Sequence, residues 1–274
     1  MPISVLITGA NGFLARAIAA VAPPDWCLLG LLRPGSATAE GRWHAVHERL
    51  ETLQELGPVD AVLHLAARIP ADLRRFEPEL VAANVMLPAQ LLQRFPDARH
   101  VLASSVAVYG VPATLPLAAD TPPSPATPYG WSKLAAEHVL RMAPRHAILR
   151  LSSIIGRGMR PGSFIPAAVA AAKGGRIGVH GDGSRVQDYI DVRDAARMCV
   201  AAVVRKDNFA TLAVSGEAHS NAEVARMLAA LCGADVVFSG TDASPSHAYT
   251  LDNAVNLGPC LVPLRETLAD MVAG

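Results

Sequence analysis

Short apolar segments alternate along the first two-thirds of the chain with longer segments whose apolar residues recur at helical spacing. The apolar segments offer hydrophobic side chains to both faces, as buried parallel strands do. They lie at residues 3–9, 27–33, 60–67, 100–105 and 146–153. Buried strands separated by helices predict a parallel sheet that is covered on both faces and joined by right-handed crossovers.

The pattern loosens into shorter elements after Arg150. Residues 115–128 are rich in proline, and we expect them to form an ordered loop over the carboxyl-terminal edge of the sheet. We predict an α/β fold in which residues 1–153 form a Rossmann-like, doubly wound dinucleotide-binding domain. Residues 154–274 are expected to form a smaller substrate-binding lobe, partly interleaved with the sheet. Within this lobe, Ser220 and Glu223 have the spacing of a capping box, which predicts a helix.

The first predicted strand runs through two glycines into an alanine-rich helix. Gly9 and Gly12 break the apolar pattern directly before the helix. A strand, a glycine turn and a helix N-terminus present unpaired backbone N–H groups to an anion. A Cβ at these positions would block the turn or the approach of a pyrophosphate. The pattern alone is equally compatible with an ordinary strand-to-helix turn.

A tyrosine and a lysine share one face of a later predicted helix. Tyr129 and Lys133 are four residues apart, and Pro128 suits the first helical turn. An ammonium beside a phenol lowers its pKa from about 10, so the pair could act as a general acid or base. Ser104 and Ser105 end a predicted strand at the same edge, where a hydroxyl could hold a reacting oxygen. Each feature alone is also compatible with an ordinary surface position.

Together, these motifs resemble those of the extended short-chain dehydrogenase/reductases, which include nucleotide-sugar epimerases, dehydratases and ketoreductases. "TGANGFLA" resembles the glycine loop of that family, "HLAA" its third-strand motif, "SSVAVYG" its catalytic-serine strand, and "YGWSK" its Y-x-x-x-K motif. The resemblance implies that Ser105, Tyr129 and Lys133 are catalytic. The cofactor-binding residues that it implies are Gly9, Asn11, Gly12, Phe13, Leu14, Arg33, Leu65, Ala66, Ala67, Asn84, Tyr129 and Lys133. The implied substrate positions are Ser153, Arg185 and Gln187.

The sequence departs from the family pattern at four positions. Ala15 replaces the third glycine of the loop, and Arg33 stands where the family has an acidic residue after the second strand. Ser153 replaces an asparagine that meets the substrate diphosphate. Gln187 replaces a phosphate-binding arginine, although Arg185 lies two residues earlier. The last two changes weaken the expectation of a nucleotide-diphosphate substrate.

The resemblance implies an NAD(P)-dependent oxidoreductase. We expect Tyr129 to donate a proton to a substrate oxygen that Ser105 orients, while the cofactor carries the hydride. The predicted reaction is reduction of a keto group on a sugar nucleotide or similar polyol. The alternatives are an NAD-dependent nucleotide-sugar epimerase and a non-catalytic dinucleotide-sensing protein. Dehydration is disfavoured, because Ser105 is not followed by the acidic residue of similar dehydratases.

Arg33 decides the expected cofactor. It lies about 20 positions past the glycine turn, where an arginine accommodates the 2′-phosphate of NADP and an acid accepts the 2′-hydroxyl of NAD. We therefore predict NADP, with NAD as the alternative. NADP that exchanges in every cycle favours a reductase, whereas similar epimerases hold NAD tightly. A solvent-facing arginine at a strand end is the other interpretation of Arg33.

The composition narrows the range of partners. The 274 residues include 24 Lys and Arg and 24 Asp and Glu, so no basic surface for nucleic acid or a membrane is expected. No apolar run approaches the ~20 residues of a membrane span, and no signal peptide is expected. Four scattered cysteines fit reduced thiols in a cytoplasmic protein. Only His44 and His47 lie close together among nine histidines, so we expect no metal site. A homodimer is compatible with the sequence.

Overall fold

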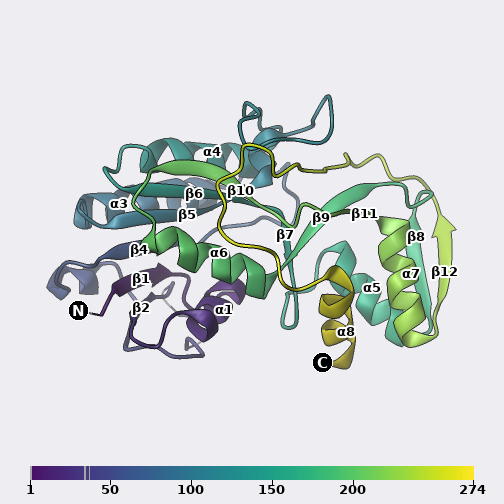
Figure 1. Ribbon diagram of the computed structural model, residues 1–274, viewed down its shortest axis with the longest axis horizontal. Coiled ribbons are helices and arrows are strands. Elements are labelled where there is room, and N and C mark those ends of the chain that lie inside the picture. Colours follow the sequence, from purple (N-terminus) through teal and green to yellow (C-terminus); the bar gives the residue numbers. More distant parts are fainter. Residues whose placement is uncertain (1, 34, 37) are drawn as a thin grey trace.

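The main sheet of the molecule is parallel throughout. Figure 1 shows the computed structural model of the chain, which describes residues 2–33, 35–36 and 38–274. Seven strands pair in the order β10-β6-β5-β4-β1-β2-β3, and each neighbouring pair is parallel. They are β1 (Ser4–Thr8), β2 (Cys27–Leu31), β3 (Ala45–His47), β4 (Ala61–His64), β5 (Arg99–Ser105), β6 (His146–Leu151) and β10 (Phe209–Ala213). The prediction of a Rossmann-like α/β fold is confirmed.

Helices cover both faces of this sheet. Helices α1 (Phe13–Val21) and α6 (Val192–Val204) pack on the face to which Val5 and Ile7 point. The opposite face carries α3 (Leu87–Arg94) and α4 (Pro128–Leu140), with Leu6 of β1 and Leu102 of β5 beneath them. The remaining elements on this side are η1 (Glu51–Glu55), α2 (Pro78–Val81), the π-helical η2 (Ala82–Met86) and η3 (Val106–Tyr109). Alternation along each strand therefore fills two separate core layers.

The smaller lobe, at the right of Figure 1, has a hydrophobic core of its own. A three-stranded sheet has the order β11-β9-β7, and β8 pairs with β12. The strands are β7 (Ser153–Ile155), β8 (Arg176–His180), β9 (Val186–Asp191), β11 (Ala218–Ser220) and β12 (Asp235–Ser239). The helices are α5 (Phe164–Lys173), α7 (Asn221–Cys232) and α8 (Leu264–Ala273). Between β9 and β11 the chain returns to the main sheet as α6 and β10.

Several predicted element boundaries differ from those of the structure. The strand expected over residues 60–67 ends at His64, and the one expected over 27–33 ends at Leu31. The segment 146–153 is divided between β6 and β7, and β3 was not predicted. The capping box at α7 is confirmed, because Ser220 Oγ accepts from Glu223 N at 3.1 Å and Glu223 Oε2 accepts from Ser220 N at 2.7 Å.

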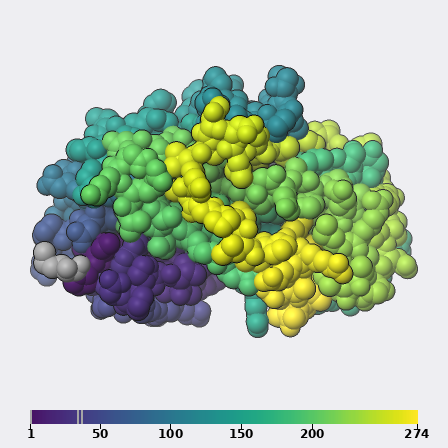
Figure 2. All heavy atoms as spheres, in the orientation of Figure 1, coloured from purple at the N-terminus to yellow at the C-terminus, as the bar shows by residue number. Residues whose placement is uncertain are grey.

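The C-terminal segment crosses back over the larger domain, as the yellow spheres of Figure 2 show. Val255 N donates to Thr211 Oγ1 at 2.8 Å, and His247 Nε2 bonds the carbonyl oxygen of Gly110 at 3.0 Å. Residues close to the end of the chain thus bond both β10 and the loop after β5. None of the described helices is long and apolar enough to cross a membrane. The described residues also include no cluster of three metal-ligating side chains, and the four cysteines are free.

Candidate active site

The glycine loop after β1 is shaped by close backbone contacts. Gly9 has a φ of +69°, and a Cβ there would lie 3.1 Å from Cα of Ala66. Gly12 N donates to Gly9 O at 2.7 Å, and a Cβ on Gly12 would lie 2.9 Å from that oxygen. Both glycines are therefore required by the fold of the loop itself, in addition to any bound anion.

Helix α1 begins at the end of this loop, at Phe13. No side chain of the described residues caps its first turn, for which Gly12 is the N-cap residue. The first N–H groups of the helix are consequently available to a ligand at the carboxyl-terminal edge of the sheet. Phe13 and Leu14 of the first turn pack into the core, so they fix the helix rather than offering polar groups.

Thr8 joins the glycine loop to the loop after β4. Its Oγ1 accepts hydrogen bonds from the backbone N–H groups of Leu65 and Ala66 at 3.0 and 2.9 Å. These two hydrogen bonds hold the segment of Leu65, Ala66 and Ala67 beside Gly9. The sequence predicted that these three residues bind the cofactor. Thr8 itself was not predicted as a site residue. Its position directly before the first glycine is the signal that could have identified it.

Asn84 joins the loop after β4 to α4. It is buried, and its Oδ1 accepts from Arg68 N at 2.7 Å. Its Nδ2 donates to Ser132 Oγ at 2.8 Å, and Ser132 Oγ donates to Tyr129 O at 2.7 Å. The sequence predicted Asn84 as cofactor-binding. The structure gives its polar atoms to protein groups, so Asn84 holds the Tyr129 turn in place.

The three residues predicted to be catalytic come together at the carboxyl-terminal edge. Ser105 ends β5, and its side chain shares a hydrogen bond with that of Tyr129. Tyr129 lies in the first turn of α4, which Thr127 caps by accepting from Gly130 N at 3.1 Å. A Cβ on Gly130 would lie 2.5 Å from Ala107 O, so this glycine lets α4 approach the serine strand.

Burial shifts the pKa values of the Tyr129 and Lys133 side chains in opposite directions. It raises the pKa of Tyr129 to about 12, an effect that the hydrogen bond with Ser105 opposes. It lowers the pKa of Lys133 to about 8, an effect that Glu137 opposes. The expectation that Lys133 gives Tyr129 a lowered pKa is therefore not met, because burial has the largest influence on the phenol and raises its pKa. At neutral pH Tyr129 is a protonated donor beside an ammonium.

A buried ionic network supports α4 directly below this pair. Glu137, one turn after Lys133, accepts from Ser104 Oγ at 2.6 Å and from Arg150 Nε and Nη2 at 3.1 and 2.9 Å. Arg150 Nη1 also donates to Tyr109 Oη at 3.0 Å. This network was not predicted from the sequence. A glutamate one turn from a buried lysine, on an otherwise apolar helix face, is the signal for it.

Arg33 is exposed just beyond the end of β2. This end lies at the glycine loop, because Gly9 N donates to Leu31 O at 2.8 Å. Asn11 follows in the same loop. The structure therefore keeps the predicted cofactor residues of β1, β2 and β4 along one edge.

Two of the predicted substrate residues, Ser153 and Gln187, lie in the small three-stranded sheet, and Arg185 directly precedes β9. Ser153 begins β7 in register with Tyr189 of β9, two residues beyond Gln187. Gln187 Nε2 donates to Tyr189 Oη at 3.3 Å. Arg185 Nε donates to Pro245 O at 3.2 Å, which ties β9 to the C-terminal segment. The structure thus groups these residues in the lobe and gives Arg185 a partner that sequence spacing does not reveal.

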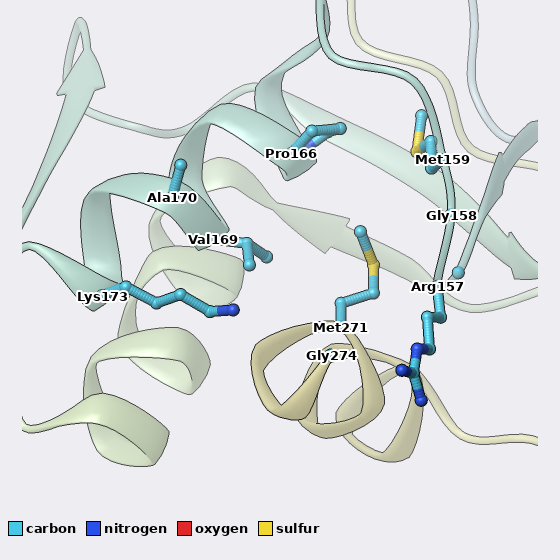
Figure 3. Close-up of a pocket in the computed structure, with 10 residues that line it drawn as sticks. Arg157, Gly158, Met159, Pro166, Val169, Ala170, Lys173, Met271 and Gly274 are labelled. Carbon is cyan, nitrogen blue, oxygen red and sulfur yellow. The ribbon is translucent and has the colours of Figure 1, made fainter.

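A separate hollow of about 240 Å³ lies elsewhere in the small lobe (Figure 3). The loop after β7, helix α5 and helix α8 surround it, with Arg157, Lys173 and Met271 among its lining residues. None of the predicted catalytic, cofactor or substrate residues lines it. It is therefore distinct from the predicted site.

Comparison with known proteins places this arrangement in one family. The family model of the NAD dependent epimerase/dehydratase family matches residues 5–214. The match covers most of the chain, so the protein belongs to the NAD-dependent epimerase/dehydratase family. The resemblance to the extended short-chain dehydrogenase/reductases is thereby confirmed.

Curated relatives align with a large part of the chain at about 30% identity. A UDP-glucose 4-epimerase of Azospirillum brasilense is 31% identical over 232 residues, which cover 72% of this chain and 66% of that protein. A UDP-glucose 4-epimerase of Lactobacillus helveticus is 29% identical over 212 residues, which cover 66% of this chain and 64% of that protein. The chain thus spans less than two thirds of the length of these relatives.

Solved structures match over nearly the whole chain. MoeE5 in complex with UDP-glucose and NAD is 27% identical with a TM-score of 0.82, covering 98% of this chain and 97% of that one. The UDP-glucuronic acid 4-epimerase from Bacillus cereus, in complex with UDP-glucuronic acid and NAD, is 21% identical with a TM-score of 0.83. That alignment covers 99% of this chain and 98% of the other, and it shows a shared fold.

Proposed function

We propose that the protein is an NAD-dependent epimerase that inverts one carbon of a nucleotide sugar. The observation that carries this proposal is the grouping of Ser105, Tyr129 and Lys133 at the sheet edge. The similar proteins of Lactobacillus helveticus and Azospirillum brasilense are both UDP-glucose 4-epimerases. The reductase expected from the sequence has weaker support, because it rests on Arg33 alone. An epimerase uses the same residues twice, once in oxidation and once in reduction.

The residues of the dinucleotide loop fit NAD. The backbone approaches closely at Gly9 and Gly12, and the first turn of α1 offers N–H groups that could meet a pyrophosphate. NAD, when bound, supplies the acceptor and donor of hydride. Arg33, exposed at the end of β2, is the one observation that favours NADP and with it a reductase. We therefore propose NAD and retain NADP as the alternative that cofactor titration tests.

Each catalytic residue has a distinct part in the proposed reaction. Ser105 holds the reacting oxygen of the sugar and shares a hydrogen bond with Tyr129. Tyr129 is held protonated by burial, which suits return of the proton to a carbonyl oxygen. Removal of the proton in the opposite step requires a stabilised phenolate. The Ser105 hydroxyl and the Lys133 ammonium are the groups placed to stabilise it.

The small lobe is proposed to hold the nucleotide part of the substrate. Ser153 and Gln187 are neutral, so they are weaker partners for a diphosphate than cationic residues would be. Arg185 supplies a cation beside them, although its Nε already donates to Pro245 O. We propose that Arg185 contacts the diphosphate through its remaining guanidinium N–H groups while it anchors the C-terminal segment.

An apolar face on α2, η2 and α4 supports a homodimer. Val81, Met86 and Trp131 are exposed on these elements, and Met142 is exposed two residues after the end of α4. We propose that these residues pair with a second copy of the chain, since α2, η2 and α4 pack on one another and exposed apolar side chains that gather on a surface mark interaction sites. Light scattering of the parent and of Trp131→Glu tests it. A monomeric parent would contradict the proposal.

The proposed reaction can be tested directly with UDP-glucose. Purified protein without added cofactor is incubated with UDP-glucose, and the sugar nucleotides are separated by chromatography. The expected result is formation of UDP-galactose without net release of reduced cofactor, and its loss in Tyr129→Phe. Consumption of added NADPH with no epimer formed would instead favour the reductase.

A further inference from the structure

Asp188 of β9 is a buried carboxylate that has no part in the chemistry above. It is 2% exposed, and its two oxygens accept hydrogen bonds from three residues. Oδ1 accepts from Ser152 Oγ at 2.5 Å and from Ser215 N at 3.1 Å, and Oδ2 accepts from Ser215 Oγ and Gly216 N, each at 2.8 Å. Burial raises the pKa of this carboxyl, and the hydrogen bonds from the same residues oppose the rise. Asp188 is thus the centre of a cluster of uncharged donors.

The serines of this cluster lie beyond the ends of two neighbouring strands of the main sheet. Ser152 directly follows β6, and Ser215 lies two residues after the end of β10, which pairs with β6. Leu151, the last residue of β6, is in register with Ser105 of β5. Asp188 therefore joins β9 of the small lobe to the same edge of the main sheet at which Ser105 lies.

Two of the predicted substrate residues are direct chain neighbours of this cluster. Ser153 follows Ser152, and Gln187 precedes Asp188. Ser153 is in register with Tyr189, whose Oη accepts the hydrogen bond from Gln187 Nε2. Because side chains alternate along a strand, Gln187 and Tyr189 point to the face of β9 opposite to that of Asp188. The carboxylate thus holds one face of the strand and leaves the other face to the predicted substrate residues.

We propose that Asp188 is a positioning residue that sets where the segments of Ser153 and Gln187 lie relative to Ser105. The path between them is short, because Ser105 pairs with the last residue of β6, Ser152 comes next, and its hydroxyl bonds Asp188. Without the carboxylate, β9 loses its side-chain bonds to the ends of β6 and β10, and a substrate held by the lobe is no longer aligned with the catalytic edge. The inference rests on the proposed function, in which Ser153 and Gln187 lie beside the nucleotide part of the substrate.

The cluster requires a carboxylate and cannot be satisfied by an amide of the same size. Each oxygen of Asp188 accepts from one backbone N–H group, Ser215 N on Oδ1 and Gly216 N on Oδ2, and backbone donors cannot be turned into acceptors. An asparagine side chain has one acceptor oxygen and one NH₂ group. In either orientation of the amide, Asp188→Asn therefore places a donor against one of the two backbone N–H groups.

A second buried aspartate offers a matched control. Asp194 of α6 is 1% exposed, and its two oxygens accept from the successive backbone N–H groups of Leu261 and Val262 at 2.9 and 3.0 Å. It also pairs with Arg197. None of these partners is a predicted substrate residue. Asp188→Asn and Asp194→Asn should both lower the melting temperature, so a difference between them in ligand binding reports more than a loss of stability.

Calorimetry with UDP measures the positioning role. Asp188→Asn should bind UDP about 10-fold more weakly than the parent, the loss of about one hydrogen bond to the ligand, and should raise KM for UDP-glucose more than it lowers kcat. Asp194→Asn should stay within about 2-fold, and the content of bound dinucleotide should be unchanged in both. Ser152→Ala removes only the bond to the end of β6 and should weaken UDP about 3-fold, which keeps the test valid if Asp188→Asn does not fold. UDP affinity equal to that of the parent in folded Asp188→Asn, or in Ser152→Ala if Asp188→Asn does not fold, would overturn the inference.

Hydrogen–deuterium exchange without ligand separates this inference from the proposed function. In Asp188→Asn the backbone N–H groups of Ser215 and Gly216 and those of β7 and β9 should exchange faster than in the parent, while those of β5 do not change. Asp194→Asn should leave all of these segments as in the parent. If the parent binds no UDP and forms no epimer, the proposed function fails, and exchange still decides whether Asp188 holds the two strands. Equal exchange of β7 and β9 in Asp188→Asn and the parent would overturn the positioning role.

Discussion

The catalytic edge of the main sheet and the substrate region of the small lobe are built in different ways. At the edge, side chains bond across elements: Thr8 of β1 holds the loop after β4, and Asn84 holds that loop to α4. In the small lobe, Gln187 bonds within its own strand, and Arg185 bonds the backbone of a long C-terminal segment. The arrangement that we propose for proton and hydride transfer is thus held by the main sheet, whereas the proposed substrate region depends on where a connecting segment lies.

This difference suggests that turnover and substrate affinity depend on different regions of the molecule. In the proposed reaction the buried Tyr129 and Lys133 act at the reacting oxygen, so the edge that holds them governs the chemical step. We propose that the lobe selects the substrate, although neutral residues occupy two of the three positions predicted to contact it. Changes at the edge should therefore lower turnover, and changes in the lobe should alter affinity.

The largest effect is expected for Tyr129→Phe. Loss of the acid–base hydroxyl should lower kcat by about 10² to 10⁴, with the content of bound dinucleotide unchanged. Tyr109→Phe is a matched control, since it also removes a buried hydroxyl, but one that bonds Arg150. It should lower the melting temperature rather than kcat. Turnover of Tyr129→Phe within a few-fold of the parent would remove Tyr129 from the mechanism.

Gly12→Val should abolish most dinucleotide binding. A Cβ at Gly12 lies 2.9 Å from Gly9 O, so the branched side chain displaces the loop that meets the pyrophosphate. Loss of two charge-assisted hydrogen bonds corresponds to at least ~100-fold weaker affinity, measurable by calorimetry. Gly57→Val is the control, because a Cβ at Gly57 has nothing within 4 Å. Unchanged affinity in a folded Gly12→Val protein would contradict this account of the loop.

Arg33→Asp should change which cofactor is preferred. The substitution removes a cation from the end of β2 and adds an acid that repels a 2′-phosphate and accepts a 2′-hydroxyl. The ratio of NADP to NAD affinity should fall by about 10-fold, the equivalent of one hydrogen bond to a charged group. Titration of both cofactors against the two proteins measures it. An identical ratio in parent and variant would show that Arg33 only faces solvent.

Arg185→Ala tests whether the small lobe holds a diphosphate. The parent should bind UDP, and the variant should bind it about 5- to 10-fold more weakly, with little change in kcat. Arg176→Ala, at an exposed position of β8, is the control. If UDP binds the parent and Arg185→Ala with equal affinity, Arg185 does not contact the diphosphate and the nucleotide lies elsewhere.

The last prediction concerns the free energy of unfolding and its dependence on pH. The pKa of Lys133 is lowered to about 8, so a buried positive charge destabilises the native state below that pH. Lys133→Met should therefore be more stable than the parent at pH 7, by about 2–3 kcal/mol. Between pH 8 and about 10.5 the unfolded chain binds more protons at this lysine, so the parent gains stability and the difference shrinks. A difference that is constant with pH would contradict the lowered pKa.

Part of the carboxyl-terminal edge of the main sheet could be predicted from the sequence, because the sequence patterns that mark strands and strand ends are local. Apolar runs located five strands of the main sheet, and strand ends at one edge brought Ser105, Tyr129 and Lys133 together. The short, half-exposed strand β3 lacks such a run and was missed. A local pattern predicts where a strand ends, and topology then gathers the ends.

The remaining contacts depend on residues far apart in the sequence. Glu137 meets Ser104 and Arg150 only because α4 packs across β5 and β6, and His64 meets His100 only because β4 pairs with β5. Arg185 meets Pro245 through a segment whose path no periodicity indicates. The raised pKa of Tyr129 could not be predicted from the sequence either, since it depends on how completely the side chain is buried.

The central claim is that one bound cofactor removes and returns the same hydride at an edge that stays closed to solvent. The most direct measurement incubates the purified protein with UDP-glucose carrying deuterium at the carbon that is inverted, and follows the label by mass spectrometry. The account predicts UDP-galactose that keeps the deuterium, with no cofactor consumed. Loss of the deuterium from the product, or stoichiometric oxidation of added NADPH without epimer, would contradict it.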